Sequence, residues 1–149
     1  MERTAPMNER YLDVIALRGR GYCCSQIMAL MFLENRDEKD DFLVRAMGGL
    51  CNGVGDSGEV CGCLSGGACI VSLAAGKGSD EETAHEELPV MLFELTQWFG
   101  ERTSGPYGGM RCDQILAHSP DKRACLDLVV ETYERVLSIL DAHDATSVG

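Results

Sequence analysis

The sequence predicts an all-α protein, a compact single-domain bundle of about five to seven helices around a central helix of small residues. Apolar residues recur at helical spacing along most of the chain, and no segment alternates apolar and polar residues as a strand would. The stretch 60–75 is nearly free of charge and rich in Gly, Ala, Ser and Cys, which is typical of a helix packed closely against its neighbours. With 149 residues, of which 45% are hydrophobic, one domain with an ordinary core is expected over residues 1–149.

Three helices are expected before the central stretch. The first runs from Asn8, its expected N-cap, to about Arg18, and glycines end it. The second begins in the run Cys-Cys-Ser-Gln at residues 23–26 and closes near residue 35. The third follows the charged segment 34–41 and stops at Gly48. Its expected inward side chains are Phe42, Leu43, Ala46 and Met47.

The central stretch combines a glycine loop at 48–58 with the small-residue helix at 60–75. Gly62, Gly66 and Gly67 each cost the helix about 0.8–1.0 kcal/mol relative to Ala, so we expect a close approach of backbone or ligand there. The loop segment GVGDSG at 53–58 matches GxGxxG, but the dinucleotide fingerprint requires a preceding strand and a helix is expected instead. The loop is better suited to bringing backbone N–H groups near sulfur.

The second half of the chain reads as an acidic linker and further helices. After the linker 79–87, a helix is expected from Leu88 to about residue 101, with Pro89 in its first turn. A loop at 103–109, a short helix at 112–117 and a last helix to about residue 142 follow, the last one capped by Ser119. The expected buried stripe of the first of these helices is Leu88, Met91, Leu92, Leu95 and Phe99.

Charge and targeting signals narrow the function classes. The net charge of −11 disfavours nucleic-acid binding and favours a neutral or basic protein partner. Residues 1–10 lack the apolar core of a signal peptide, and the run 60–75 is short for a membrane span, so a cytoplasmic location is expected. In that compartment, eight cysteines are more typical of metal binding or thiol chemistry than of structural disulfides.

Five cysteines fall at expected helix starts: Cys24, Cys61, Cys63, Cys112 and Cys125. A helix N-terminus offers unpaired N–H groups and partial positive charge, which lower a thiol pKa and stabilise a thiolate or a metal–thiolate cluster. We therefore expect these residues to converge at one end of the bundle. The alternative is that small apolar cysteines simply fill a tight core, where we place Cys69. Adjacent Cys23 and Cys24 are expected to face different directions.

Histidine adds little to this site. His118, between Cys112 and Cys125, is the one histidine worth testing as a ligand, although a turn position before the Ser119 cap explains it as well. His85 and His143 are expected to be solvated.

The cysteine order and its neighbours resemble the C-GCAxxG-C-C family of small redox-active proteins. The matching elements are Gly-Tyr-Cys-Cys-Ser-Gln at 21–26, Cys-Gly-Cys-Leu-Ser-Gly at 61–66, and single cysteines at 112 and 125, within a resemblance that spans about residues 13–136. The resemblance implies redox activity and four characteristic cysteines: Cys24, Cys61, Cys112 and Cys125. The chain departs from the pattern by carrying Cys63 where Ala is usual, and Cys23, Cys51 and Cys69 are additional.

Three functions follow as alternatives. The first is electron transfer through an iron–sulfur cluster on the four characteristic cysteines, with Cys51 or Cys63 as substitute ligands, docked to a basic redox protein. The second is thiol–disulfide exchange started by Cys24 or Cys61. The third is a zinc-binding or assembly protein. A second copy of the chain is also a candidate partner for the glycine-rich helix.

Overall fold

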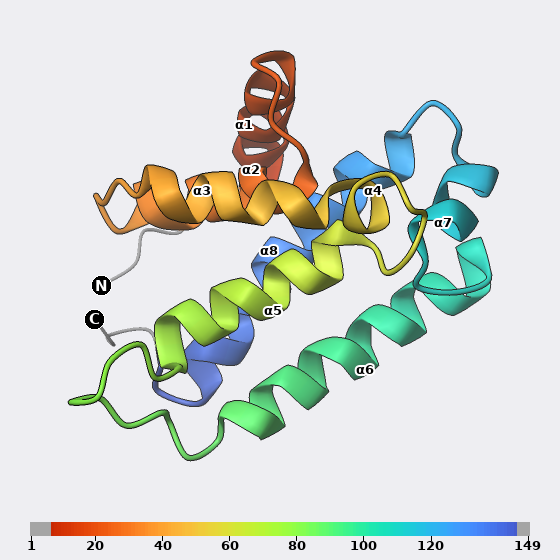
Figure 1. The fold of residues 1–149 in the computed structure, drawn as a ribbon. Helices are drawn as coiled ribbons and strands as arrows, with labels where there is room; N and C mark the ends of the chain where they lie inside the picture. The colour runs from red at the N-terminus through yellow and green to blue at the C-terminus, as the bar shows by residue number, and fades with distance from the viewer. Residues whose placement is uncertain (1–6, 146–149) are drawn as a thin grey trace.

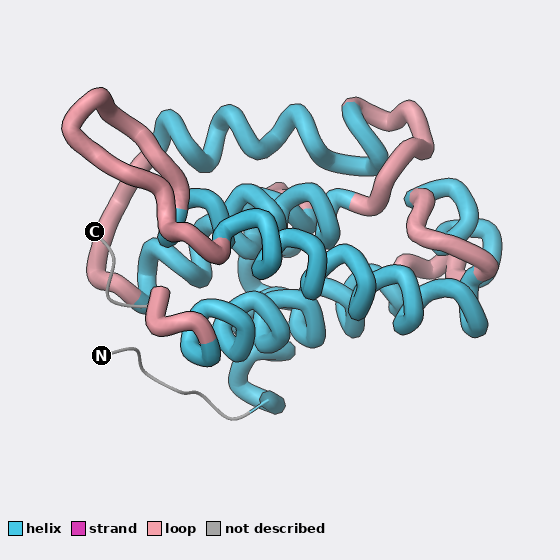
Figure 2. Tube along the Cα trace, turned by 90° about the horizontal axis from the view of Figure 1, so that it is seen from below, coloured by secondary structure: helices cyan, strands magenta, loops and turns pink. Residues whose placement is uncertain are grey.

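The computed structural model describes residues 7–145, and it confirms the all-α prediction. The residues 7–145 contain no strand, only one isolated antiparallel bridge between Val60 and Arg111 (Figures 1 and 2). The elements are α1 (Met7–Gly19), α2 (Cys24–Asn35), α3 (Asp41–Met47), the 3₁₀ turn η1 (Gly48–Leu50), α4 (Cys51–Val54), α5 (Gly62–Ala75), α6 (Leu88–Tyr107), α7 (Cys112–His118) and α8 (Arg123–Ala142).

Helix α5 is the central element, as its small residues predict. It packs against α2, α6 and α8 (Figure 1). A Cβ added to Gly66 would lie 3.0 Å from the Cα of Ser25 in α2. A Cβ on Gly67 would lie 3.2–3.3 Å from side chains of α6 and α8. The two glycines therefore allow α2 to approach α5 on one side and α6 and α8 to approach it on a second, neighbouring side.

The remaining core is built from helical stripes. In α6, Met91, Leu95 and Phe99 are fully buried, as predicted, and Thr103 continues the stripe one turn further. The predicted members Leu88 and Leu92 are half-buried at its edge. Helix α8 contributes the largest buried side chain, Tyr133.

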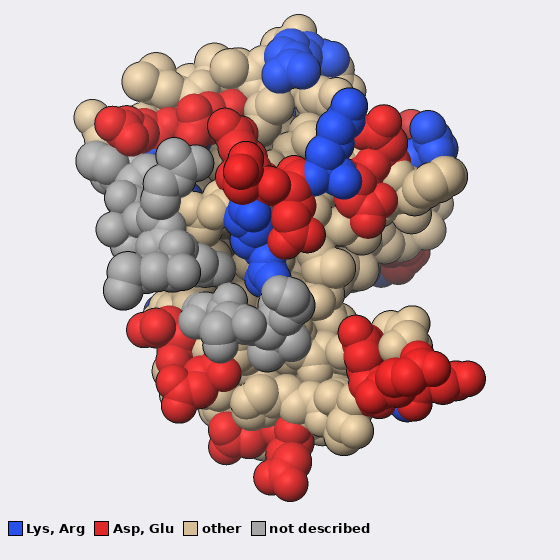
Figure 3. All heavy atoms as spheres, turned by 90° about the vertical axis from the view of Figure 1, so that its left-hand side faces the viewer, with Lys and Arg blue, Asp and Glu red and all other residues tan. Residues whose placement is uncertain are grey.

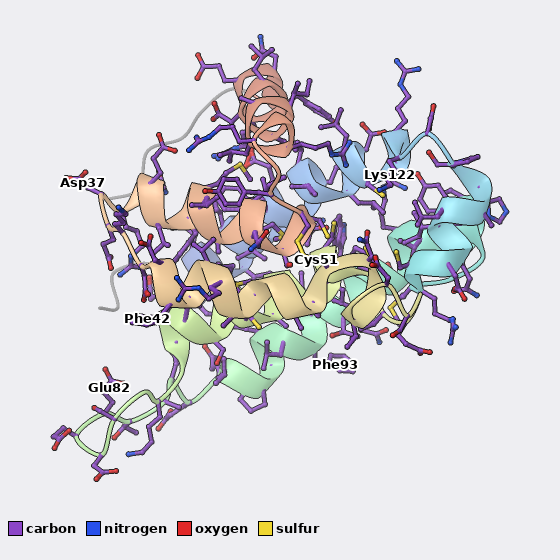
Figure 4. All side chains as sticks on the ribbon, turned by 45° about the horizontal axis from the view of Figure 1, so that its top comes forward. Asp37, Phe42, Cys51, Glu82, Phe93 and Lys122 are labelled. Carbon is purple, nitrogen blue, oxygen red and sulfur yellow. A yellow bond between two sulfur atoms is a disulfide. The ribbon has the colours of Figure 1, made fainter. Side chains whose placement is uncertain are left out.

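The predicted inward face of α3 is partly wrong. Met47 is buried and Leu43 half-buried, but Phe42 is 82% exposed and Ala46 is exposed. Helix α3 has seven residues and packs mainly on α2, so its buried positions are Val44 and Met47, three residues apart. Figure 4 shows Phe42 pointing away from the bundle.

Two helix boundaries also differ from expectation. Helix α6 continues through the predicted loop 103–109 to Tyr107, because the buried Thr103 hydroxyl donates to the Phe99 carbonyl and the helix ends only at Gly108, which has φ +79°. Helix α8 begins at Arg123 rather than at Pro120. Its N-cap is Lys122 rather than the predicted Ser119, although the Ser119 Oγ accepts the Ala124 N–H at 3.0 Å.

The N-cap prediction for Asn8 is wrong as well. Asn8 lies within α1, which the structure describes from Met7 onward, and its side-chain oxygen accepts the N–H of Glu9 at 3.0 Å.

Acidic side chains dominate much of the surface. On the face shown in Figure 3 they form several groups, while most of the basic side chains lie in its upper half. Within residues 7–145, no helix is both long enough and apolar enough to span a membrane.

His143 joins the end of α8 to the start of α6. Its Nδ1 lies 2.9 Å from the carboxylate of Glu87 and its Nε2 lies 3.0 Å from that of Glu94, and these two contacts raise the His143 pKa above its usual value. The Nε2 atom of His85 lies 2.9 Å from the His143 carbonyl. Both histidines, expected in solvent, therefore take part in a hydrogen-bond network.

This network predicts a pH dependence of stability. Because the folded-state pKa of His143 is raised, its contribution is complete below the unfolded-state pKa of about 6.5 and is lost as pH rises through the folded-state value. Urea unfolding from pH 5.5 to 8.5 should show the wild type losing stability relative to His143→Asn as pH rises. A difference between the two proteins that stays constant over this range would contradict the assignment.

The close contact at Gly66 predicts a second effect. Gly66→Ala should lower the free energy of unfolding by about 1 kcal/mol or more, because overpacking against the α2 backbone outweighs the gain in helix propensity. Gly100→Ala in α6 is the matched control. Its Cβ would meet only the Met110 sulfur, at an ordinary 3.6 Å, so it should stabilise the protein by about 0.5–1 kcal/mol. Equal effects in urea unfolding would show that propensity alone governs both sites.

Candidate redox site

The starts of α5 and α7 are held together by the single antiparallel bridge. The Cys61 N–H donates to the Met110 carbonyl at 2.9 Å, and the Cys112 N–H donates to the Glu59 carbonyl at 2.6 Å. In this pattern Cys61 and Cys112 lie on the same side of the bridge as diagonal neighbours, a relation that places such residues about 7–8 Å apart. Figure 1 shows the starts of α5, α7 and α8 at one end of the bundle, beside α4.

Three sulfur atoms meet where α2 and α5 begin. The Cys63 thiol is hydrogen-bonded to both Cys24 and Cys61. Cys24 is the first residue of α2, and Cys61 immediately precedes α5. A Cβ on Gly62 would lie 2.6 Å from the Cys24 sulfur, so glycine is needed at this position for the sulfur to approach the start of α5.

This arrangement divides charge unequally among the three sulfurs. The hydrogen bond from Cys63 lowers the pKa of Cys24 to about 7, with help from the N–H groups of Ser25 and Cys24, although burial opposes it. The same Cys63 thiol and the N–H groups of Cys63 and Leu64 lower the pKa of Cys61. Those hydrogen bonds, together with burial, raise the Cys63 pKa well above its usual value. Of the three thiols, Cys63 therefore holds its proton most firmly, and Cys24 and Cys61 lose theirs more readily than an ordinary cysteine.

Cys112 and Cys125 lie within the electrostatic reach of this trio. Burial and then the charges of Cys61 and Cys24 raise the pKa of Cys125 to about 11. The same causes raise the pKa of Cys112, whereas the Lys122 ammonium acts in the opposite direction. We call Cys24, Cys61, Cys63, Cys112 and Cys125 the sulfur cluster. These are the five cysteines that the sequence predicts at helix starts.

Cys51, a predicted substitute ligand, is placed differently. It forms a disulfide with Cys23, with the two Cα atoms 5.9 Å apart, and so ties the start of α4 to that of α2 (Figure 4). The Ser25 hydroxyl lies 3.4 Å from each of these two sulfurs and donates to the Met47 carbonyl at 2.7 Å. The sequence reasoning missed this pairing, because residues 28 apart in the chain give no pairing signal.

The run Cys-Cys-Ser-Gln has a structural explanation. Gln26 accepts the Cys23 N–H and donates to the Val44 carbonyl, at 3.3 and 3.1 Å, while Ser25 bonds the end of α3. The two polar residues thus fix Cys23 and Cys24 in place. As expected, the adjacent cysteines serve different neighbours: Cys23 pairs with Cys51 and Cys24 joins the sulfur cluster.

The GxGxxG segment begins within α4, after η1, and no strand precedes it in the described part of the chain, so it is not a dinucleotide fingerprint. Residues 52–56 all have positive φ, including the non-glycine residues Asn52, Val54 and Asp56. Five consecutive left-handed residues are rare in L-amino-acid chains. Gly53 must remain glycine, because a Cβ there would collide with the backbone of Glu59. The loop thereby folds tightly beside the starts of α5 and α7.

Two predicted positions are corrected by the structure. Cys69 is exposed rather than in the core, because α5 turns it away from α2, α6 and α8. His118 is exposed, and its Nδ1 lies 3.0 Å from the Gln114 carbonyl of its own helix, so it occupies a helix-end position and not the sulfur cluster.

The thiols of the sulfur cluster lie near one another, but this alone does not make them a set of metal ligands. Across residues 7–145, no three Cys, His, Asp or Glu side chains are grouped with the spacing of a metal site. The cluster thiols have the chemistry of iron–sulfur or zinc ligands. Three of them, Cys24, Cys61 and Cys63, are joined by hydrogen bonds through Cys63.

Residues 22–139 match the model of the family described as "Putative redox-active protein (C_GCAxxG_C_C)". The match covers most of the chain, so the protein belongs to this family of cysteine-rich redox-active proteins, as the resemblance in the sequence predicted. No curated protein and no solved structure matches the chain.

The central role of Cys63 leads to a prediction. Cys63→Ala removes the S–H donor and should raise the pKa of Cys24 from about 7 toward the ordinary thiol value of about 8.5. Cys63→Ser keeps a donor and should leave the Cys24 pKa low. The measurement is the pH dependence of Cys24 alkylation by iodoacetamide, followed by peptide mass spectrometry. Cys69→Ser is the control, and a Cys24 pKa that is equal in all four proteins would contradict the shared-proton arrangement.

Proposed function

We propose that this protein is a thiol–disulfide redox protein whose reactive sulfurs are Cys24, Cys61 and Cys63. The observation that carries the proposal is the contact of the Cys63 thiol with two sulfurs, each at the start of a helix. A thiol attacks disulfides best when its pKa is near the ambient pH, and the pKa of Cys24 meets this condition.

The reaction balances as an ordinary two-step exchange. Cys24 releases its proton to water, and the thiolate attacks one sulfur of a partner disulfide. The partner S–S bond breaks, a mixed disulfide forms, and the departing half takes up a proton from water as a thiol. Cys63 then attacks the Cys24 sulfur, and the second half of the partner leaves as a thiol. Two cysteine thiols and one external disulfide become one internal disulfide and two external thiols, so two electrons and two protons pass to the partner.

The Cys23–Cys51 disulfide is a second observation that supports a thiol–disulfide function. It lies at the same helix start as Cys24, and Ser25 contacts both of its sulfurs. We expect a cytoplasmic location, where disulfides are more often transient and redox-linked than structural. For the electron donor we expect a protein with a basic surface, because the chain carries a net charge of −11.

An iron–sulfur cluster is a second candidate. It is favoured by the convergence of the four characteristic cysteines at one end of the bundle, where each of Cys112 and Cys125 senses the charge of Cys24 and Cys61. Four thiolates are a suitable donor set for such a cluster. The spacing described above supports the thiol mechanism first, and zinc would use the same donors.

One experiment separates these functions. Protein purified without oxygen is analysed for iron, zinc and acid-labile sulfide, then reduced and equilibrated in dithiothreitol buffers of graded potential. We expect a reversible internal disulfide between Cys63 and Cys24 or Cys61, mapped by peptide mass spectrometry. Cys24→Ser should shift the pairing to Cys61, whereas the exposed Cys69→Ser should change nothing.

Two results would overturn the thiol assignment. Iron and sulfide in similar amounts would favour the cluster, and one zinc per chain would favour the zinc protein. Metal-free protein that forms no reversible disulfide within the cluster would also contradict it.

A further inference from the structure

One cysteine of the sulfur cluster lines a cavity. A hollow of about 490 Å³ opens beside the start of α7, and Cys112 lies in its wall although its residue is only 7% exposed. Cavities that bind small molecules typically measure about 300–1,000 Å³. Neither Cys24, Cys61 nor Cys63 lines this cavity, so it gives access to the cluster through Cys112 alone.

The cavity wall carries both signs of charge. Asp56, from the left-handed loop, and Lys122, which precedes α8, line it together with Asp113. The Asp113 carboxylate is already occupied, because the Arg111 guanidinium donates to its two oxygens at 3.0 and 2.9 Å. Asp56 and Lys122 are therefore the charges offered to a ligand: one carboxylate for an ammonium group and one ammonium for a carboxylate.

We infer that this cavity binds a small disulfide of the amino-acid class, carrying both an ammonium and a carboxylate group, and presents its S–S bond to Cys112. The inference rests on the proposed thiol–disulfide function and names a substrate class for the same cluster. A wholly anionic disulfide would meet Asp56, and a wholly cationic one would leave Lys122 without a partner.

Cys61 is placed to complete the exchange. It lies on the same side of the Val60–Arg111 bridge as Cys112, as its diagonal neighbour. Cys112 releases its proton to water, and its sulfur then attacks the substrate and breaks the S–S bond as a mixed disulfide forms. The departing half takes up a proton from water and leaves as a thiol.

The diagonal spacing of about 7–8 Å exceeds the usual Cα separation in a disulfide, so the start of α7 moves toward Cys61 before the second step. Cys61, its proton released to water, then attacks the Cys112 sulfur, and the second half of the substrate leaves as a thiolate that is protonated by water. The balance is two cysteine thiols and one small disulfide converted to a Cys61–Cys112 disulfide and two small thiols.

A charge series of disulfides tests the inference. Fully reduced protein is mixed at low salt with cystine, with the dication cystamine, or with the dianion 3,3′-dithiodipropionate, and acid-quenched samples are mapped by mass spectrometry. We expect the first mixed disulfide on Cys112, formed fastest with cystine, followed by the Cys61–Cys112 disulfide. With Cys61→Ser, the mixed disulfide on Cys112 should accumulate.

Charge variants assign the two ends of the substrate. Asp56→Asn should slow the reactions of cystine and cystamine by about two- to fivefold, the range expected for an exposed ion pair, without slowing dithiodipropionate. Lys122→Gln should slow cystine and dithiodipropionate but not cystamine. Asp37→Asn is the matched control for Asp56, since both are exposed aspartates with positive φ, and Lys39→Gln is the control for Lys122.

The outcomes distinguish this inference from the function on which it rests. Labelling that begins at another cysteine, or rates that do not respond to Asp56→Asn and Lys122→Gln, would overturn the inference. If the dithiothreitol titration still forms the disulfide of Cys63, the proposed function stands without it. If neither reagent produces an internal disulfide, both are wrong.

Discussion

The close approach of α2 to α5 is the constraint on which the rest of the structure depends. At Gly66 the backbone of one helix meets that of the other, and at Gly62 the Cys24 sulfur lies where a side chain would otherwise stand. Any larger residue at these positions would separate the two helix starts. The sulfur contact of Cys24 and Cys63 would then be lost, because it spans the same interface. The low helix propensity of glycine is thus offset by the close packing of α2 on α5, which also brings Cys24 to Cys63.

The electrostatics of the site follow from the same packing. Buried thiols ordinarily resist ionisation, and Cys125 shows this behaviour. Cys24 and Cys61 escape it because each receives N–H groups from a helix start and a hydrogen bond from one shared thiol. The pKa values of these two buried thiols are therefore lowered mainly by hydrogen bonds, with a smaller contribution from the charge of Arg18 at Cys24.

The sequence was sufficient for the fold class and for the grouping of cysteines at helix starts, because both depend on local periodicity and capping. The sequence was not sufficient to predict side-chain burial or disulfide pairing where these depend on which helices pack together. Phe42 was assigned inward because it is apolar, yet α3 packs mainly on α2 and leaves Phe42 exposed. Cys69 was placed in the core because α5 is central, yet one face of that helix has no covering helix. The Cys23–Cys51 pairing requires two turns to be brought together by tertiary packing, which no local pattern encodes.

Because Cys63 stands where the family usually has alanine, the sulfur cluster holds an odd number of cysteines instead of an even one. Six of the eight cysteines are free thiols, and setting aside the exposed Cys69 leaves an odd number in the sulfur cluster. Disulfides consume sulfurs in pairs, so complete oxidation within the cluster would always leave one thiol unpaired. That remaining thiol could attack a neighbouring disulfide and move the bond from one pair to another. An even cluster would become inert once fully oxidised, whereas this one retains an internal nucleophile in every oxidation state.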